Sequence, residues 1–462
     1  MRISYTFVQD SANSATDLRL VTHEAAELNL SHGTSANQAL NINQIVPAFG
    51  PASSEDETMS WGFFVKHSQD PQESAKDPKM TWDTPDGKVY AGLNPPRGST
   101  QKGIFYPRAG ILGGCGSHNA LIPILTHNSD WQYITDITGD RSCRPKAELR
   151  KFNIPVRVDL PGVGTNLQDN YEYSVAGRSP RVVSLLANGT VNGADVYLKQ
   201  WSESGTGPYK GDGIEVAVLN RTRFSKSDED LFLYSTPLCF TGFFPGYSRI
   251  TTGGDGHTYT WVVLKLRQEN QCGTVTLRSA NPFDTPVINF EFYAGPDAAH
   301  PRNDRRHDLD VMAEGVRIMR GFMDAVKGPV GPLKEILPGR DVSNTPEKLR
   351  EDIKHNSFSH HAASSCPIGG DGDPMACLDS QFRVRGVDGL RVVDASVFPC
   401  VPGTFPQLPV YMTSERAVDM ILEDAGFKPQ KVTFDDATLE NLKEGEVLID
   451  SSKGECRNVH VD

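Results

Sequence analysis

Short β-prone runs separated by turn residues fill the middle of this chain and restrict its fold more than any other feature. Each run is rich in Val, Leu, Thr, Tyr or Phe and is bounded by Gly, Pro, Asn or Asp, which is typical of strands. The runs are EVAVLNRTRF (215–224), LFLYST (231–236), YTWVVLKL (259–266), GTVTLRS (273–279) and TPVINFEFY (285–293). We predict that they form an antiparallel sheet.

Two helices are predicted after these strands. Residues 305–326 place apolar side chains at helical spacing and should pack on the sheet. These side chains are Leu309, Met312, Val316, Ile318, Met319 and Phe322. A second helix is expected over 408–426, where Gly426 closes it.

Three further strands and two caps are expected. The strands are LRLVT (18–22), PVRVDL (155–160) and LRVVDASVFP (390–399), the last of them buried and followed by a turn. In the Gly-rich turn after 160, Asn166 or Asp169 is available as a helix cap.

Charge and apolar patterning exclude several partners. The 46 Lys+Arg residues against 58 Asp+Glu give a net charge of -12, so the chain has no overall basic field for a nucleic acid. It has no apolar run of 18 residues and its start lacks the core of a signal peptide. We expect a soluble protein, cytoplasmic by default, with no membrane partner; the oligomeric state is left open.

The cysteines and glycine motifs limit the chemistry. The eight cysteines include no CxxC pair, and no metal site is predicted. PGVGTNL (161–167) has two glycines of a GxGxxG fingerprint but Leu167 in place of the third, and neither a P-loop nor GxSxG is present. Phosphoryl transfer and serine hydrolysis therefore lose their usual signatures. From the residues alone, GILGGCGSHNA (110–120) could be a phosphate cradle, a metal site or a cofactor tether.

His360 and His361 are adjacent in SFSHHAASSCPIGG (357–370). Neighbouring side chains on an extended segment face opposite ways, so at most one of the two is expected to point at a given site.

Four motifs together resemble the glucose-methanol-choline (GMC) family of flavin oxidoreductases. They are RAGILGGCGSHNALI (108–122), DLPGVGTNLQDN (159–170), HAASSCPIGG (361–370) and LDSQFRVRGVDGLRVVDASVFPCVP (378–402). The resemblance implies an α/β plus α+β fold, in which a discontinuous Rossmann-type FAD-binding domain accompanies a substrate domain built on an antiparallel sheet. The domains expected are FAD-binding at 1–170 and 376–427, substrate-binding at 171–375, and a polar tail at 428–462.

The resemblance also implies roles for particular residues. His361 matches the family's catalytic histidine, which accepts the proton of a small alcohol or aldehyde substrate while hydride passes to flavin N5, and Gln407 matches the second active-site position. Because a Gln amide takes up no proton at physiological pH, His361 is expected to be the only base. The residues implied to contact FAD are Gly113, Gly114, His118, Asn119, Asp394 and Ala395, with His118 as a covalent tether to the flavin.

The sequence departs from the family at two places. The strand–GxGxxG–helix unit is absent, with Glu24 as the candidate for a ribose-binding residue, and a domain-sized segment is missing between 137–143 and 144–156. The fingerprint holds the adenosine diphosphate half of FAD, so weaker FAD binding is expected. Two alternatives follow: a flavin-independent protein of the GMC fold that catalyses a non-redox step such as cyclisation or dehydration, and an inactive truncated remnant.

Overall fold

A computed structural model of the chain gives the positions of most residues between 60 and 427. The residues that it describes are 6–8, 17–21, 40–41, 55, 60–109, 115, 149, 151–184, 186–187, 189, 195–210, 213–225, 228–252, 254–281, 283–294, 305–341, 343–403, 405–427, 446–450 and 455–460.

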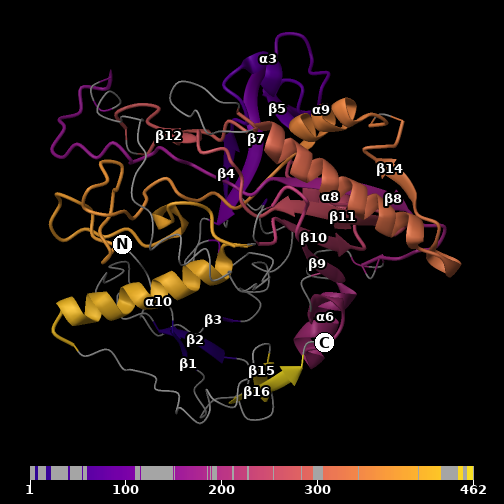
Figure 1. The fold of residues 1–462 in the computed structure, drawn as a ribbon. Helices are drawn as coiled ribbons and strands as arrows, with labels where there is room; N and C mark the ends of the chain where they lie inside the picture. The colour runs from indigo at the N-terminus through magenta and orange to yellow at the C-terminus, as the bar shows by residue number, and fades with distance from the viewer. Residues whose placement is uncertain are drawn as a thin grey trace. The chain divides into compact units, whose positions relative to one another are not determined.

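A five-stranded sheet with the order β14-β8-β11-β10-β9 forms the centre of the fold (Figure 1). All four neighbouring pairs are antiparallel, which confirms the predicted sheet for three of its five runs, those that become β9, β10 and β11. The strands are β8 (Glu172–Arg178), β9 (Val216–Asn220), β10 (Leu231–Thr236), β11 (Thr258–Lys265) and β14 (Lys334–Leu337).

The middle strands of this sheet are buried on both faces. Successive residues of β10 alternate between two apolar clusters, with Leu231 in one and Phe232 in the other, as the two-residue period of a strand requires. The first cluster includes Val316 of α8 (Arg305–Ala325), which packs on β8, β10 and β11 as predicted (Figure 1). The second cluster lies on the opposite face and includes Phe358 and Phe405.

The other helices are short, apart from α9 and α10. The α-helices are α3 (Pro71–Ser74), α6 (Val196–Ser204), α7 (Tyr247–Thr252), α9 (Pro346–Asn356) and α10 (Gln407–Asp424). The 3-10 helices are η4 (Pro208–Lys210), η5 (Gly328–Val330) and η6 (Ala395–Val397). α10 confirms the predicted second helix, and Gly426 just after it has the left-handed φ of 80° that suits a glycine stop.

The remaining strands pair in smaller antiparallel sheets. The four-stranded sheet β4-β7-β5-β6 contains β4 (Ser60–Val65), β5 (Met80–Asp83), β6 (Val89–Ala91) and β7 (Thr100–Ala109). The others are β12 (Thr274–Thr276) with β13 (Val287–Asn289), β15 (Glu446–Asp450) with β16 (Glu455–His460), and β1 (Thr6–Val8), β2 (Asp17–Val21) and β3 (Leu40–Asn41). β2 confirms the strand predicted at 18–22, whereas β12 and β13 lie outside the central sheet.

Two predicted strands are wrong. Residues 155–160 are alternately half-buried and exposed, but they form no strand within the described part of the chain. Alternation marks the two sides of an extended segment and does not supply a hydrogen-bonded partner. In 390–399 the pairing is limited to one bridge, Arg383 with Arg391, because Asp394 then caps η6 and turns the backbone.

The chain divides into two compact units, Met1–Ser414 and Glu415–Asp462. The first contains the central sheet and α8, and the second contains β15 and β16. No helix in the described residues combines the length and apolar character that crossing a bilayer requires.

Candidate active site

Two segments distant in sequence lie side by side at the end of β8. The segment after α9 pairs antiparallel with the residues that lead into β8, through bridges of Phe358 with Glu172 and of Ala363 with Gln168. Backbone hydrogen bonds of 2.8–3.1 Å form both bridges. His361 is therefore held opposite the stretch between Gln168 and Glu172.

His360 and His361 point in different directions, as their adjacency predicts. Nε2 of His360 lies 2.9 Å from the carbonyl oxygen of Pro107, and its ring stacks on Phe243. Nδ1 of His361 lies 3.8 Å from Oε1 of Glu172, and its ring meets Phe405 edge-on with 4.9 Å between centroids. Each ring thus meets an aromatic side chain that belongs to the second apolar cluster or packs against it.

Asp169 fixes the backbone around His361. Its carboxylate accepts hydrogen bonds from the backbone N–H of His361 at 2.6 Å, from the Tyr106 hydroxyl at 2.7 Å, and from the Ser359 hydroxyl. Burial raises the pKa of Asp169 to about 6, although these hydrogen bonds lower it. Asp169 is therefore a tether between segments, and its prediction as a helix cap is wrong.

Asn166 is not a cap either. It has a left-handed φ of 58°, and its Nδ2 donates to the carbonyl oxygens of Ser364 and Pro399. Like Asp169, it connects the Gly-rich turn to segments far along the chain.

The imidazole of His361 is buried and uncharged at physiological pH. Its side chain is 13% exposed, and burial lowers its pKa well below 6.5, with further lowering from His360 and Arg108. Nδ1 is buried and has no hydrogen-bond partner among the residues that the structure describes. A neutral imidazole has one ring nitrogen with a free lone pair, and that nitrogen can accept a proton from a substrate.

Glu172 and Tyr234 are site residues that the sequence analysis does not identify. The Tyr234 hydroxyl donates to Oε2 of Glu172 at 2.7 Å. Burial raises the pKa of Glu172 to about 8, with a further rise from Asp169, while the hydrogen bond from Tyr234 lowers it. The clue available in the sequence is a carboxyl within the apolar stretch that becomes β8.

The residues predicted near the middle of FAD lie next to the segment that carries His361. Asp394 is exposed, and its Oδ1 accepts from the N–H of Ser396 at 2.7 Å at the start of η6. The carbonyl oxygen of Ala395 accepts from the N–H of Ser364, and that of Ser396 accepts from the N–H of Cys366. η6 is thereby fixed to the chain a few residues beyond His361.

For the other predicted site residues, the structure gives no contact with His361 within the ranges that it describes. Gln407 begins α10, and its Nε2 donates to the Tyr411 hydroxyl at 3.4 Å. Its role as the second active-site residue stays a prediction. The remaining predicted FAD contacts and the ribose-binding candidate lie outside the described residues; they are Gly113, Gly114, His118, Asn119 and Glu24.

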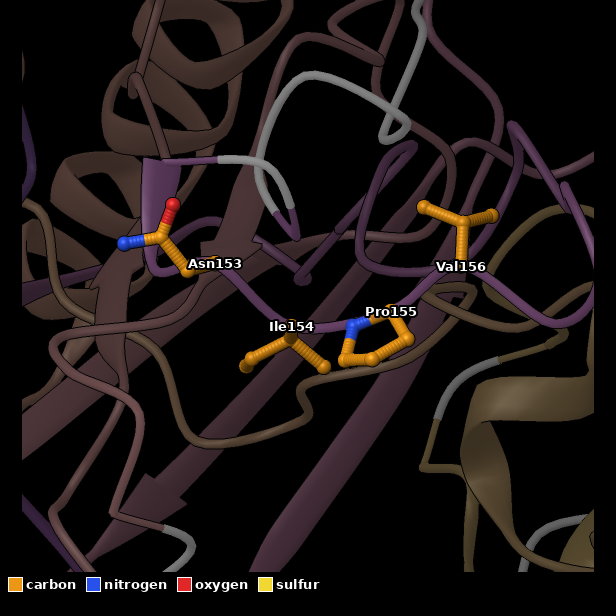
Figure 2. A pocket seen from close by; sticks show the side chains of 4 residues that line it. All are labelled: Asn153, Ile154, Pro155 and Val156. Carbon is orange, nitrogen blue, oxygen red and sulfur yellow. The ribbon is translucent and has the colours of Figure 1, made fainter.

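A surface pocket lies apart from these residues. It has a volume of about 460 Å³ and is lined by Asn153, Ile154, Pro155 and Val156, which all come from one short stretch (Figure 2). None of its lining residues belongs to the site around His361. Within the described residues, no group of three or more His, Cys, Asp or Glu side chains could hold a metal ion.

Solved structures share this fold. A formate oxidase variant from Aspergillus oryzae RIB40 superposes with a TM-score of 0.52 over 65% of this chain and 53% of its own, at 21% identity. A second formate oxidase structure gives a TM-score of 0.51 over 80% of this chain and 60% of its own, at 18% identity. The chain thus has the mixed α/β architecture of these oxidases, as predicted.

Sequence comparison then shows which proteins the chain is similar to. A family model for GMC oxidoreductases matches residues 269–414. An oxygen-dependent choline dehydrogenase of Vibrio vulnificus (strain YJ016) is 30% identical over 332 residues, 71% of this chain and 55% of that protein. A glucose methanol choline oxidoreductase of Aspergillus terreus (strain NIH 2624 / FGSC A1156) is 32% identical over 59% of this chain and 44% of that protein. Residues 269–414 thus match the GMC oxidoreductase family, and the chain spans about half the length of the curated relatives to which it is similar.

Proposed function

We propose that this protein is an FAD-dependent oxidoreductase that acts on the CH–OH group of a small alcohol or aldehyde, with His361 as the base. The observation that carries the proposal is the buried, neutral imidazole of His361, whose Nδ1 has no hydrogen-bond partner in the described part of the chain. It lies within the stretch that matches the family. Relatives named as choline dehydrogenases support an alcohol as the substrate class.

The residues around His361 suit the flavin end of FAD. A buried polar atom without a partner, next to the apolar ring of Phe405, is what a site for a planar heterocycle with polar edges presents. FAD, when bound, supplies the hydride acceptor at flavin N5. We propose that Asp394 and Ala395 hold the middle of the cofactor, and that Gly113, Gly114 and Asn119 contact the flavin.

His361 handles the proton in this proposal. As a neutral imidazole it accepts the hydroxyl proton of the substrate and then releases it to solvent. Gln407 can orient the substrate oxygen through its amide but cannot take up the proton. The tether of Asp169 to the backbone N–H of His361 keeps the ring in place through the cycle.

The test begins with the visible spectrum of the purified chain before and after FAD is added. Flavin colour is expected, and a protein that takes up no FAD would contradict the proposal. In a flavin-loaded protein, His361→Ala should slow flavin reduction by substrate about 10²- to 10⁴-fold, the usual contribution of a general base. His360→Gln is the matched control, because its amide can still reach the carbonyl of Pro107; reduction at the wild-type rate in His361→Ala would remove His361 from its role.

Two further measurements separate the alternatives. Colour that survives acid precipitation would support a covalent tether, and His118→Ala should release it. Turnover by stringently flavin-free protein would instead place the chain among catalysts of a non-redox step.

A further inference from the structure

An acidic side chain faces the unpaired nitrogen of His361. Oε1 of Glu172 lies 3.8 Å from Nδ1, and the two side chains are 4% and 13% exposed. The other carboxyl oxygen already accepts the hydrogen bond of Tyr234. Oε1 is therefore the atom of this carboxyl that can form a hydrogen bond with His361.

Glu172 is held in a fixed position by the fold. It is the first residue of β8, where it pairs with Leu264 of β11 and forms a bridge with Phe358. Leu264 and Phe358 belong to the apolar cluster opposite α8, the same cluster that contains Tyr234 and Phe405. A carboxyl buried on this face is shielded from bulk solvent, so its hydrogen-bond and charge partners decide whether it is protonated.

We propose that Glu172 is a positioning residue for His361: its carboxylate keeps a proton on Nδ1 and so leaves Nε2 as the lone pair that receives the substrate proton. This inference rests on the function proposed above. The nitrogen of a histidine that is free to act is set by the hydrogen bond that the other nitrogen makes. A shift of about 1 Å would bring the pair into the usual N–H···O range, and such contacts often tighten only when substrate binds.

The charges around His361 and Glu172 determine the pH range in which His361 can act as the base. His360, Arg108 and burial all disfavour a proton on His361, while burial and Asp169 favour one on Glu172. Below the raised pKa of about 8 the pair therefore keeps its proton on Glu172, whose carboxyl group can then donate to Nδ1. That arrangement puts the imidazole hydrogen on Nε2 and blocks the base.

Above this pH the arrangement reverses. Glu172 is a carboxylate, Nδ1 carries the imidazole hydrogen, and Nε2 has a free lone pair. The substrate proton then moves from the hydroxyl oxygen to Nε2, and the resulting imidazolium is stabilised by the carboxylate beside it. Flavin reduction should therefore rise with pH through one apparent pKa that belongs to the pair.

The kinetic test compares the pH profile of flavin reduction in three forms of the flavin-loaded chain. Wild type should show the rise. Glu172→Gln should lose it and stay at the low-pH level of wild type at all pH values, about 10²- to 10⁴-fold below the high-pH wild-type rate, because the amide N–H donates to Nδ1 and fixes the hydrogen on Nε2. Tyr234→Phe keeps the carboxyl but lacks the hydrogen bond that lowers its pKa, so the rise should move to higher pH.

A second readout needs no flavin. In a chain labelled with ¹⁵N-histidine, the ring signals of His361, identified by their loss in His361→Ala, should report hydrogen on Nδ1 at high pH and on Nε2 in Glu172→Gln. An unchanged tautomer and an unchanged pH profile in Glu172→Gln would overturn the positioning role even if His361 proves to be the base. If the chain binds no FAD, the proposed function is contradicted, but the tautomer of His361 can still be tested. If Glu172→Gln does not fold, a Tyr234→Phe pH profile identical to that of wild type would overturn the inference.

Discussion

Two buried carboxyl groups, Asp169 and Glu172, surround the histidine at the centre of the proposed chemistry. Asp169 holds the backbone of His361 and Glu172 faces its ring. Each carboxyl is 3% exposed or less, and burial raises the pKa of both. Burying them costs stability at neutral pH, which is a common feature of sites arranged for acid–base work.

Asp169 should make the stability of the protein depend on pH. Its pKa is raised in the folded state, from 3.8 to about 6, so the folded chain binds this proton more tightly than the unfolded chain does. The stability it contributes is present below pH 4 and is lost as the pH rises through 6, an effect of about 3 kcal/mol. Asp169→Asn should flatten this part of the profile, as measured by urea unfolding at pH 4 to 7.

The control for this prediction is Asp86→Asn. Asp86 is 59% exposed and pairs with Lys88, so its loss should leave the free energy of unfolding almost unchanged. An Asp169→Asn profile with the same slope as wild type would show that Asp169 does not titrate in this range.

The sequence motifs point to His361 but not to Glu172, and the reason is physical. Along β8 the larger side chains Tyr173 and Val175 alternate with Glu172 and Ser174, which predicts a strand with one polar face toward solvent. Here that face is covered by the second apolar cluster. Its cover comes from Phe358 and Phe405, more than 180 residues away, and no local pattern indicates such a distant contact.

At the level of elements, the sheet and its covering helix follow from local pattern. α8 shows the 3.6-residue apolar spacing along its length, and strands β10 and β11 are mostly apolar because both of their faces are buried. Residues 155–160 have the two-residue period of a strand but form none, because a strand also needs a hydrogen-bonded partner. The prediction of helices was therefore more successful than that of strands.

The contact of α8 with the sheet can be tested at Gly315. A Cβ at this position would lie 2.5 Å from Cγ2 of Val263 and 3.1 Å from Cδ1 of Leu231, both buried in the sheet. Gly315→Ala gains about 1 kcal/mol in helix propensity, but overpacking costs about 1–3 kcal/mol. We expect a net loss of stability in thermal or urea unfolding.

Gly321 is the matched control on the same helix. A Cβ there would meet no atom within 4 Å, so Gly321→Ala should stabilise the protein by up to about 1 kcal/mol. Equal gains from both substitutions would mean that α8 does not press on the sheet at Gly315.

At the scale of the whole molecule, the chain has a candidate site for the flavin end of the proposed FAD but lacks the usual motif for its adenosine diphosphate end. The site around His361 is assembled from β7, the residues leading into β8, the segment after α9, and η6. These segments belong to Met1–Ser414 and make up the site proposed for the flavin ring. The 462 residues contain no GxGxxG fingerprint for the adenosine diphosphate half.

This asymmetry predicts which half of FAD the chain recognises. A ligand that binds only the folded state stabilises it by RT ln(1 + [L]/Kd), about 2.7 kcal/mol at a hundredfold excess over Kd. FMN, which carries the flavin but lacks the adenosine part, should therefore raise the melting temperature nearly as much as FAD at equal concentration. ADP should leave it unchanged, and a shift with ADP as large as that with FAD would show that the chain holds the dinucleotide end by other residues.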